Sequence, residues 1–180
     1  MMTDYLGGWH DALGFLTTPG VVSDLVHEGT RYAVIGPQGA GDAPGAIDAF
    51  PHRISPGSIE YEAEETEAGL WTVSVRFRIA GTLEGWQKDC PERAAVFIVE
   101  GHPKQPQCLL IGTPERPLQR SISLISQRGE ENYLGTEVVF TGTDAVPYRR
   151  ALAHHHYGRW RFAGCRSNLS IPDSLRWQTT

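Results

Sequence analysis

Three consecutive histidines, His154 to His156, are the most conspicuous candidates for chemistry in this sequence of 180 residues. On an extended segment His154 and His156 share one face, so both imidazoles could bind the same metal ion. A tetrahedral site would need further ligands, for which Cys165, His102 or a carboxylate could serve. Because two histidines alone do not form a site, solvated or packed side chains are the favoured interpretation. We expect no metal and no other cofactor.

The sequence patterns that support nucleophilic catalysis or nucleotide binding do not occur in this chain. There is no G-x-S-x-G motif, and the serines of residues 121–126 follow the alternation of a predicted strand. Cys90 and Cys108 lie in segments that we expect in the core, so they are not expected to be reactive thiols. The Gly- and Pro-rich segment 36–45 lacks both the G-K-[ST] and the G-x-G-x-x-G pattern and is expected to form a loop or an arm. These absences predict that the protein is not an enzyme.

Carboxylates at alternate positions could supply a pair of catalytic acids. In residues 58–64 polar side chains alternate with apolar ones, which is typical of a strand with one solvated face. The polar set is Ser58, Glu60, Glu62 and Glu64. Three carboxylates on one solvated face indicate a charged stripe rather than an acid–base pair whose two pKa values are driven apart.

Apolar runs predict a mainly β fold. The strongest signal is at residues 71–79, where five apolar residues alternate with four polar ones. Continuous apolar runs at 95–99 and 108–111 predict a hairpin, and the amphipathic segments 118–127 and 133–141 predict a second one. The expected fold class is therefore a β-sandwich or barrel.

One short helix is expected to flank this sheet at residues 82–90, with Thr82 as its cap and with Leu83, Trp86 and Cys90 on its inward face. Weaker patterns elsewhere predict further short elements. These are a helix at 20–27, a strand at 32–35, one or two helical turns within 144–157 and a strand at 157–162.

Charge is distributed unevenly along the chain, whose formal net charge is -5. Residues 1–67 carry 11 acidic and 2 basic residues, whereas residues 149–180 carry 1 and 6. The two ends can pair within one subunit or with neighbouring copies in a head-to-tail assembly. Nucleic-acid binding by the basic end is a weaker alternative because the whole chain is acidic. We divide the chain into an N-terminal arm with loops (1–57), a β domain (58–148) and a basic C-terminal arm (149–180).

Composition indicates a soluble, folded protein that is made in the cytosol. Apolar residues make up 40% of the chain, and no segment approaches the about 20 apolar residues that a membrane span requires. The N-terminus lacks the pattern of a secretory signal. Three widely separated cysteines argue against a disulfide scaffold and against a zinc knuckle.

The order of elements from about residue 60 to residue 147 resembles the tail-tube-like β domain of tailed bacteriophages and related injection machines. Tube, distal-tail and baseplate-hub proteins contain this domain. The resemblance rests on T-V-S-V at 72–75, on L-I-G-T-P-E-R-P-L at 110–118, and on the stretch from Asn132-Tyr133 to F-T-G at 140–142. These segments are strand and turn patterns and carry no catalytic signature.

The resemblance implies a structural virion protein with a β-sandwich or barrel of the tail-tube type and extended terminal arms. Such a subunit self-associates in a ring, with a hexamer favoured, and docks on other tail or baseplate proteins. It is made in the host cytoplasm, is located in the virion tail and has no membrane partner. DNA passes through the ring transiently and without sequence specificity, and an acidic wall would repel it. The residues expected to face this lumen are Ser58, Glu60, Glu62 and Glu64, and those expected to contact neighbouring subunits are Arg149, Arg150, Arg159, Arg161 and Arg166.

Two other functions remain open at this point. A soluble β-sandwich binding module could recognise a saccharide or a protein ligand, and a saccharide would need an exposed aromatic platform, for which Trp71, Trp86 or Trp160 could serve. A metal-dependent enzyme would use His154, His156 and Cys165. The first alternative requires exposed tryptophans, and the second requires a stoichiometric metal.

Overall fold

The computed structural model of the chain describes residues 8–17, 20–27, 30–37, 47–80, 85–101, 107–127, 133–156 and 158–165. Strands dominate these segments, and the expected mainly β class is confirmed. The elements are β1 (Trp9–Leu16), β2 (Gly20–His27), β3 (Thr30–Pro37), β4 (Ile47–Asp48), β5 (Glu60–Glu65), β6 (Trp71–Ala80), the 3-10 helix η1 (Gln87–Asp89), β7 (Arg93–Glu100), β8 (Gln107–Ile111), β9 (Leu118–Gln127), β10 (Tyr133–Asp144), β11 (Arg149–His156) and β12 (Arg159–Cys165).

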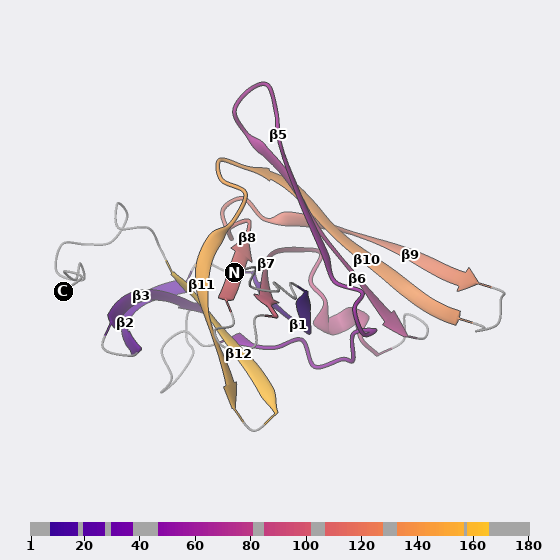
Figure 1. The fold of residues 1–180 in the computed structure, drawn as a ribbon, viewed down its shortest axis with the longest axis horizontal. Coiled ribbons are helices and arrows are strands. Elements are labelled where there is room, and N and C mark those ends of the chain that lie inside the picture. Colours follow the sequence, from indigo (N-terminus) through magenta and orange to yellow (C-terminus); the bar gives the residue numbers. More distant parts are fainter. Residues whose placement is uncertain are drawn as a thin grey trace, which may run out of the picture.

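The strands form one continuous antiparallel path that folds into two sheets (Figure 1). Its order is β2-β3-β12-β11-β8-β7-β9-β10-β6-β5, while β1 pairs with β7 and β4 pairs with β12. We call the part from β2 to β7, with β1 and β4, sheet A, and the part from β9 to β5 sheet B. Strand β7 joins the two sheets, because Arg93 and Ala94 at its start pair with β9 while the rest of the strand pairs with β8 and β1.

Strand β7 is buried on both faces. Its residues from Ala94 to Val99 are all fully buried. Val96 and Ile98 belong to a larger core under sheet B, whereas Phe97 and Val99 point into a smaller core inside sheet A. A strand between two cores has no solvated face, which explains why this segment is a continuous apolar run rather than an alternating one.

The larger core confirms the alternation predicted for residues 71–79. Val73, Val75, Phe77 and Ile79 are buried, whereas Trp71 is only partly buried against the same core. Phe77 stacks on Phe140 of β10 at a centroid distance of 6.4 Å and an interplanar angle of 10°. The predicted hairpins are also confirmed, because β7 pairs with β8 and β9 pairs with β10.

The smaller core lies where sheet A curls round on itself. Phe97 of β7 stacks on Phe162 of β12 at 5.4 Å and 8°, and Leu16, Cys108 and Leu110 surround the two rings. The N–H of Phe50, just after β4, donates to the carbonyl of Leu13 in β1 at 2.7 Å. Since β4 also pairs with β12, this bond links the two margins of the curled sheet.

Gly14 in β1 sits directly against the smaller core, and we expect Gly14→Ala to lower the free energy of unfolding by about 1–3 kcal/mol. A Cβ atom at this position would overlap Cδ2 of Phe162 and lie 2.8 Å from its Cε2. The Phe162 ring has little room to yield because it is buried and stacked. Urea unfolding measures the change, with Gly8→Ala as the matched control because that site is open. Equal stability of Gly14→Ala and the parent protein would contradict this packing.

Both terminal segments, which we divided from the β domain as arms at 1–57 and 149–180, contribute strands to the same sheet path. The N-terminal segment provides β1 to β4, and β11 and β12 extend sheet A through pairing with β8, β3 and β4. From Leu13 to Leu16 strand β1 pairs in regular register with β7, after a shift between Trp9 and Leu13. Like β7, this part of β1 lies between the two cores, because Leu13 belongs to the larger core and Leu16, on the opposite face, belongs to the smaller one.

Helix is less frequent than the sequence predicted. Residues 20–27 form β2 rather than a helix, since their β-branched valines suit the pairing with β3. Residues 149–156 form β11, and the strand predicted at 157–162 is β12, starting at Arg159. The strand predicted at 32–35 is confirmed within β3.

The flanking helix predicted at residues 82–90 is reduced to η1. Gly85, with a φ of +90°, interrupts a helical backbone just before it. Trp86 and Cys90 are nevertheless buried as predicted. Thr82 and Leu83 lie outside the described residues, as do positions 38–45 of the predicted loop and the tail from 166 onward.

Candidate functional site

The acidic stripe lies on β5, which is the last strand of sheet B. Glu60, Glu62 and Glu64 are all exposed and alternate along this strand. Glu60 is opposite Arg76 of β6, and its Oε2 accepts a hydrogen bond from Arg76 Nη1 at 3.4 Å. Ser58 does not belong to the stripe, because it precedes β5 and its Oγ accepts from the backbone N–H of Arg78 at 3.0 Å.

Ion pairs cover the outer face of sheet B next to this stripe. Arg76 Nε lies 3.7 Å from Glu137 Oε1, and Arg78 Nε lies 3.3 Å from Glu137 Oε2. Glu62 and Glu64 have no recorded ion pair within the described part of the chain. The negative charge of the stripe is therefore paired with Arg76 at the Glu60 end, whereas toward the β5–β6 turn it has no ion pair to a described residue.

A tight turn continues this charge beyond β5. We call residues 65–70 the acidic turn, since it carries exposed Glu65 and Glu67 and no basic residue. The N–H of Thr66 donates to the carbonyl of Leu70 at 2.7 Å, and the N–H of Gly69 donates to that of Thr66 at 2.9 Å. Gly69, with a φ of +74°, permits this closure. The turn projects from the body at the top of Figure 1 and ends in Leu70, whose exposed fraction is 38%.

Arg149, one of the arginines expected at subunit contacts, is bound within its own subunit. Its Nη1 and Nη2 donate to the two carboxylate oxygens of Asp144 at 2.6 and 3.0 Å. The Asp144 side chain is only 3% exposed. Burial by itself raises the pKa of Asp144, but the Arg149 hydrogen bonds and charge, with the N–H groups of Ala145 and Val146, lower it below its ordinary value.

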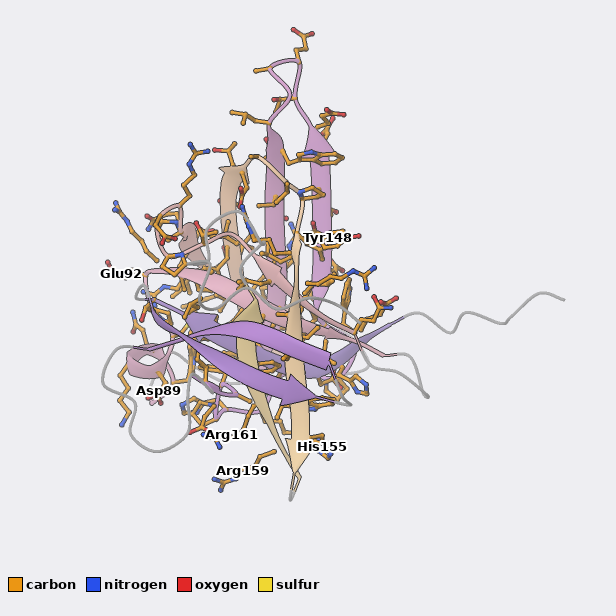
Figure 2. All side chains as sticks on the ribbon, turned by 90° about the vertical axis from the view of Figure 1, so that its left-hand side faces the viewer. Asp89, Glu92, Tyr148, His155, Arg159 and Arg161 are labelled. Atoms are coloured by element: carbon orange, nitrogen blue, oxygen red, sulfur yellow. The ribbon has the colours of Figure 1, made fainter. Side chains whose placement is uncertain are left out.

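The other arginines expected at subunit contacts differ in their surroundings. Arg150 donates to Gln107 at 3.3 Å, and Arg161 donates to Asp48 at 3.0 Å. Arg159 is exposed and has no recorded ion pair among the residues that the structure describes, and Arg166 lies outside those residues. Figure 2 shows Arg159 and Arg161 at the end of the β11–β12 hairpin, opposite the acidic turn.

A cleft of about 770 Å³ lies beside this end of the molecule. We call it the Trp160 cleft. Its apolar walls are Phe15 of β1, Phe50 after β4 and Trp160 of β12. Trp160 is flanked by the rings of His10 and His155 at centroid distances of 5.2 and 4.9 Å, which restrict its movement. This volume falls within the range of typical ligand sites.

The three carboxylates that line the Trp160 cleft are all engaged. Asp48 Oδ1 accepts from Arg161, Asp11 Oδ1 accepts from the N–H of Gly57 at 2.9 Å, and Asp89 Oδ2 lies 2.6 Å from His52 Nε2. The cleft is also lined by Lys88 and Arg159, for which no ion pair with a described residue is recorded. Of the three carboxylates only Asp48 pairs with a permanent cation, so the lining combines Lys88 and Arg159 with the negative charges of Asp11 and Asp89.

Trp160 is a candidate platform from the sequence alone, but the cleft around it could not be predicted. Its walls come from β1, from the segment around β4 and from the turn before β12, and no local spacing connects these parts. Of the other two tryptophans proposed as platforms, Trp86 is only 3% exposed and is excluded, and Trp71 packs partly against the larger core.

The cysteines that the structure describes fully are not suited to catalysis. Cys90 and Cys108 are both buried, as predicted. Burial raises the pKa of the Cys90 thiol to about 11, although a hydrogen bond and the charge of Arg120 oppose this shift. A thiol with this pKa is protonated at neutral pH and is a poor nucleophile.

The proposed histidine metal ligands are only partly visible. Residues 154–156 are extended within β11, but the side chains of His154, His156 and Cys165 and all of His102 lie outside what is described. Among the side chains described, no group of three or more His, Cys, Asp or Glu residues could hold a metal ion.

Comparisons with known proteins give no relatives: no protein-family model matches the sequence, and neither a curated protein nor a solved structure matches the chain. In the part of the chain that the structure describes, no helix combines the length and the apolar character needed to cross a membrane. The features of the molecule that can indicate a function are therefore its charged ends, the acidic stripe and the Trp160 cleft.

Proposed function

We propose that this protein is a structural, non-enzymatic subunit that associates with copies of itself head to tail. The observation that carries the proposal is the position of the two charged ends. The acidic turn lies at one end of the molecule (Figure 1), and Arg159, which lines the Trp160 cleft, lies at the other (Figure 2). Complementary surfaces on opposite ends make a heterologous contact, which produces a closed ring or an open filament rather than a two-fold dimer.

The charge on β5 favours a selective contact over general aggregation. A terminal strand exposes unpaired backbone groups, and glutamates on such a strand discourage pairing with an arbitrary second strand. A neighbour that presents arginine and lysine is accepted, because opposite charges attract and steer the encounter.

The resemblance to tail-tube-like domains supports a position in the tail of a phage or a related injection machine. Two long hairpins, β5–β6 and β9–β10, extend beyond the cores and are available to neighbouring subunits (Figure 1). Arg150, Arg159 and Arg161 remain contact candidates, and Arg149 is a weaker one because both of its terminal nitrogens donate to Asp144. In a ring whose lumen is lined by β5, Glu60, Glu62 and Glu64 would repel passing DNA.

Self-association that weakens with salt and requires the acidic turn is the expected result. The mass of the purified protein is measured by light scattering over a range of concentrations in low and high salt. Glu67→Lys is expected to reduce the assembled fraction strongly, because it reverses a charge in the turn. Glu92→Lys makes the same change at an exposed site outside the turn and is expected to assemble normally. A monomer at every concentration and salt level would refute the proposal.

A further inference from the structure

We propose that the acidic turn of one copy docks in the Trp160 cleft of the next. This inference deepens the proposed self-association and depends on it. It assigns the contact to two features of the same chain, residues 65–70 and the cleft between β1, η1 and the β11–β12 turn. The occupant of the cleft is thus a second copy of the protein.

Two cations that can pair with the turn are the first argument for this occupant. The turn presents Glu65 and Glu67, and the cleft presents Lys88 and Arg159, which have no ion pair to a described residue. Of the three cleft carboxylates, Asp48 pairs with Arg161, Asp89 lies 2.6 Å from His52 Nε2, and Asp11 accepts a hydrogen bond from the backbone N–H of Gly57. Each glutamate of the turn can therefore pair with one cation of the cleft.

Apolar complementarity is the second argument. Leu70 is exposed at the end of the acidic turn, next to the small residues Ala68 and Gly69. A narrow turn of this kind can enter an open cleft and place Leu70 near the rings of Phe50 and Trp160. Burying one leucine side chain supplies a favourable apolar contribution that the free subunit lacks.

The turn is already held in one conformation, which reduces the entropy lost on docking. Two backbone hydrogen bonds close it at 2.7 and 2.9 Å. The base of its hairpin is tied to the body, because the hydroxyl of Tyr61 donates to the carbonyl of Pro147 at 2.5 Å. In the cleft, Trp160 is fixed between His10 and His155.

Charge reversal in the cleft provides the first test. We expect Lys88→Glu combined with Arg159→Glu to weaken self-association about tenfold or more in dissociation constant. Arg116→Glu changes an exposed cation that does not line the cleft and is expected to have little effect. Mixing the cleft variant with Glu65→Lys/Glu67→Lys is expected to restore association, because the reversed turn then meets the reversed cleft.

Disulfide trapping provides a test that does not depend on the strength of the contact. A copy with Ala68→Cys in the turn is mixed with a copy with Thr17→Cys, whose position lines the cleft and is exposed. We expect a mixed disulfide under mild oxidation, whereas Thr143→Cys on the outer face of sheet B is expected to give none. Mass spectrometry of the linked peptides identifies the pair.

The outcomes separate the two proposals. If the protein assembles but the cleft variants assemble equally well and no Ala68→Cys/Thr17→Cys link forms, the docking is wrong while self-association stands. If the protein never assembles, both are wrong. Binding of a neutral sugar such as chitotriose to the cleft, with no trapping of the turn, would also overturn the docking and favour a saccharide-binding module.

Discussion

Phe77→Ala is expected to lower the free energy of unfolding by about 3–5 kcal/mol and to abolish self-association through loss of the fold. Phe77 is fully buried in the middle of β6. Its ring stacks on Phe140 and contacts those of Phe15 and Phe50, so the substitution opens a cavity where sheet B meets the N-terminal strands. Urea unfolding followed by far-ultraviolet circular dichroism measures the loss, and light scattering on the same sample measures assembly.

Two substitutions serve as controls for this cavity. Leu124→Ala removes a side chain on β9 that is 63% exposed and is expected to change stability by less than about 0.5 kcal/mol. Trp71→Ala is expected to cost less than Phe77→Ala, because Trp71 only borders the same core. A Phe77→Ala protein with nearly unchanged stability would mean that the inward face of β6 is wrongly assigned.

A strand could be predicted from the sequence where the alternation of its apolar and polar residues matches one buried and one solvated face. Residues 71–79 read as an amphipathic strand because one face is buried under sheet B and the other is solvated. Strand β1 could not be found in the same way. Both of its faces meet a core, with Leu13 in the larger one and Leu16 in the smaller one, so no solvated face marks the period of the strand, and its energy comes from pairing with a strand about 80 residues away in sequence.

The candidate site could be predicted only where its residues lie close together in the sequence. The acidic stripe follows from alternating glutamates within β5. The Trp160 cleft brings together β1, β4 and the β11–β12 turn, and its location depends on the long-range pairings β1–β7 and β4–β12. The Asp144–Arg149 pair had a weak signal, namely an aspartate at the end of an amphipathic strand, a residue type that favours turns. In the structure its carboxylate also accepts a hydrogen bond from the N–H of Ala145 at 2.6 Å.

This buried pair should make stability depend on pH. Removing one member of a buried ion pair leaves the other charge without its partner, so Asp144→Asn is expected to cost about 3 kcal/mol at pH 7. Two hydrogen bonds join the Arg149 guanidinium to the Asp144 carboxylate beside the turn between β10 and β11. The Asp144 side chain is buried there, and Arg149 is only partly exposed.

The direction of the pH effect follows from the lowered pKa of Asp144. A carboxylate with a lowered pKa in the folded state contributes its full stabilisation above its unfolded pKa of about 3.9, and the contribution disappears as pH falls through the folded value. The difference in unfolding free energy between the parent protein and Asp144→Asn is therefore expected to be constant near neutrality and to shrink below about pH 4. Asp48→Asn is the matched control, because its pair with Arg161 is exposed and contributes little at any pH. Urea titrations between pH 3 and 7 measure both variants, and a difference for Asp144→Asn that stays the same at low pH would show that the carboxylate charge does not hold this turn.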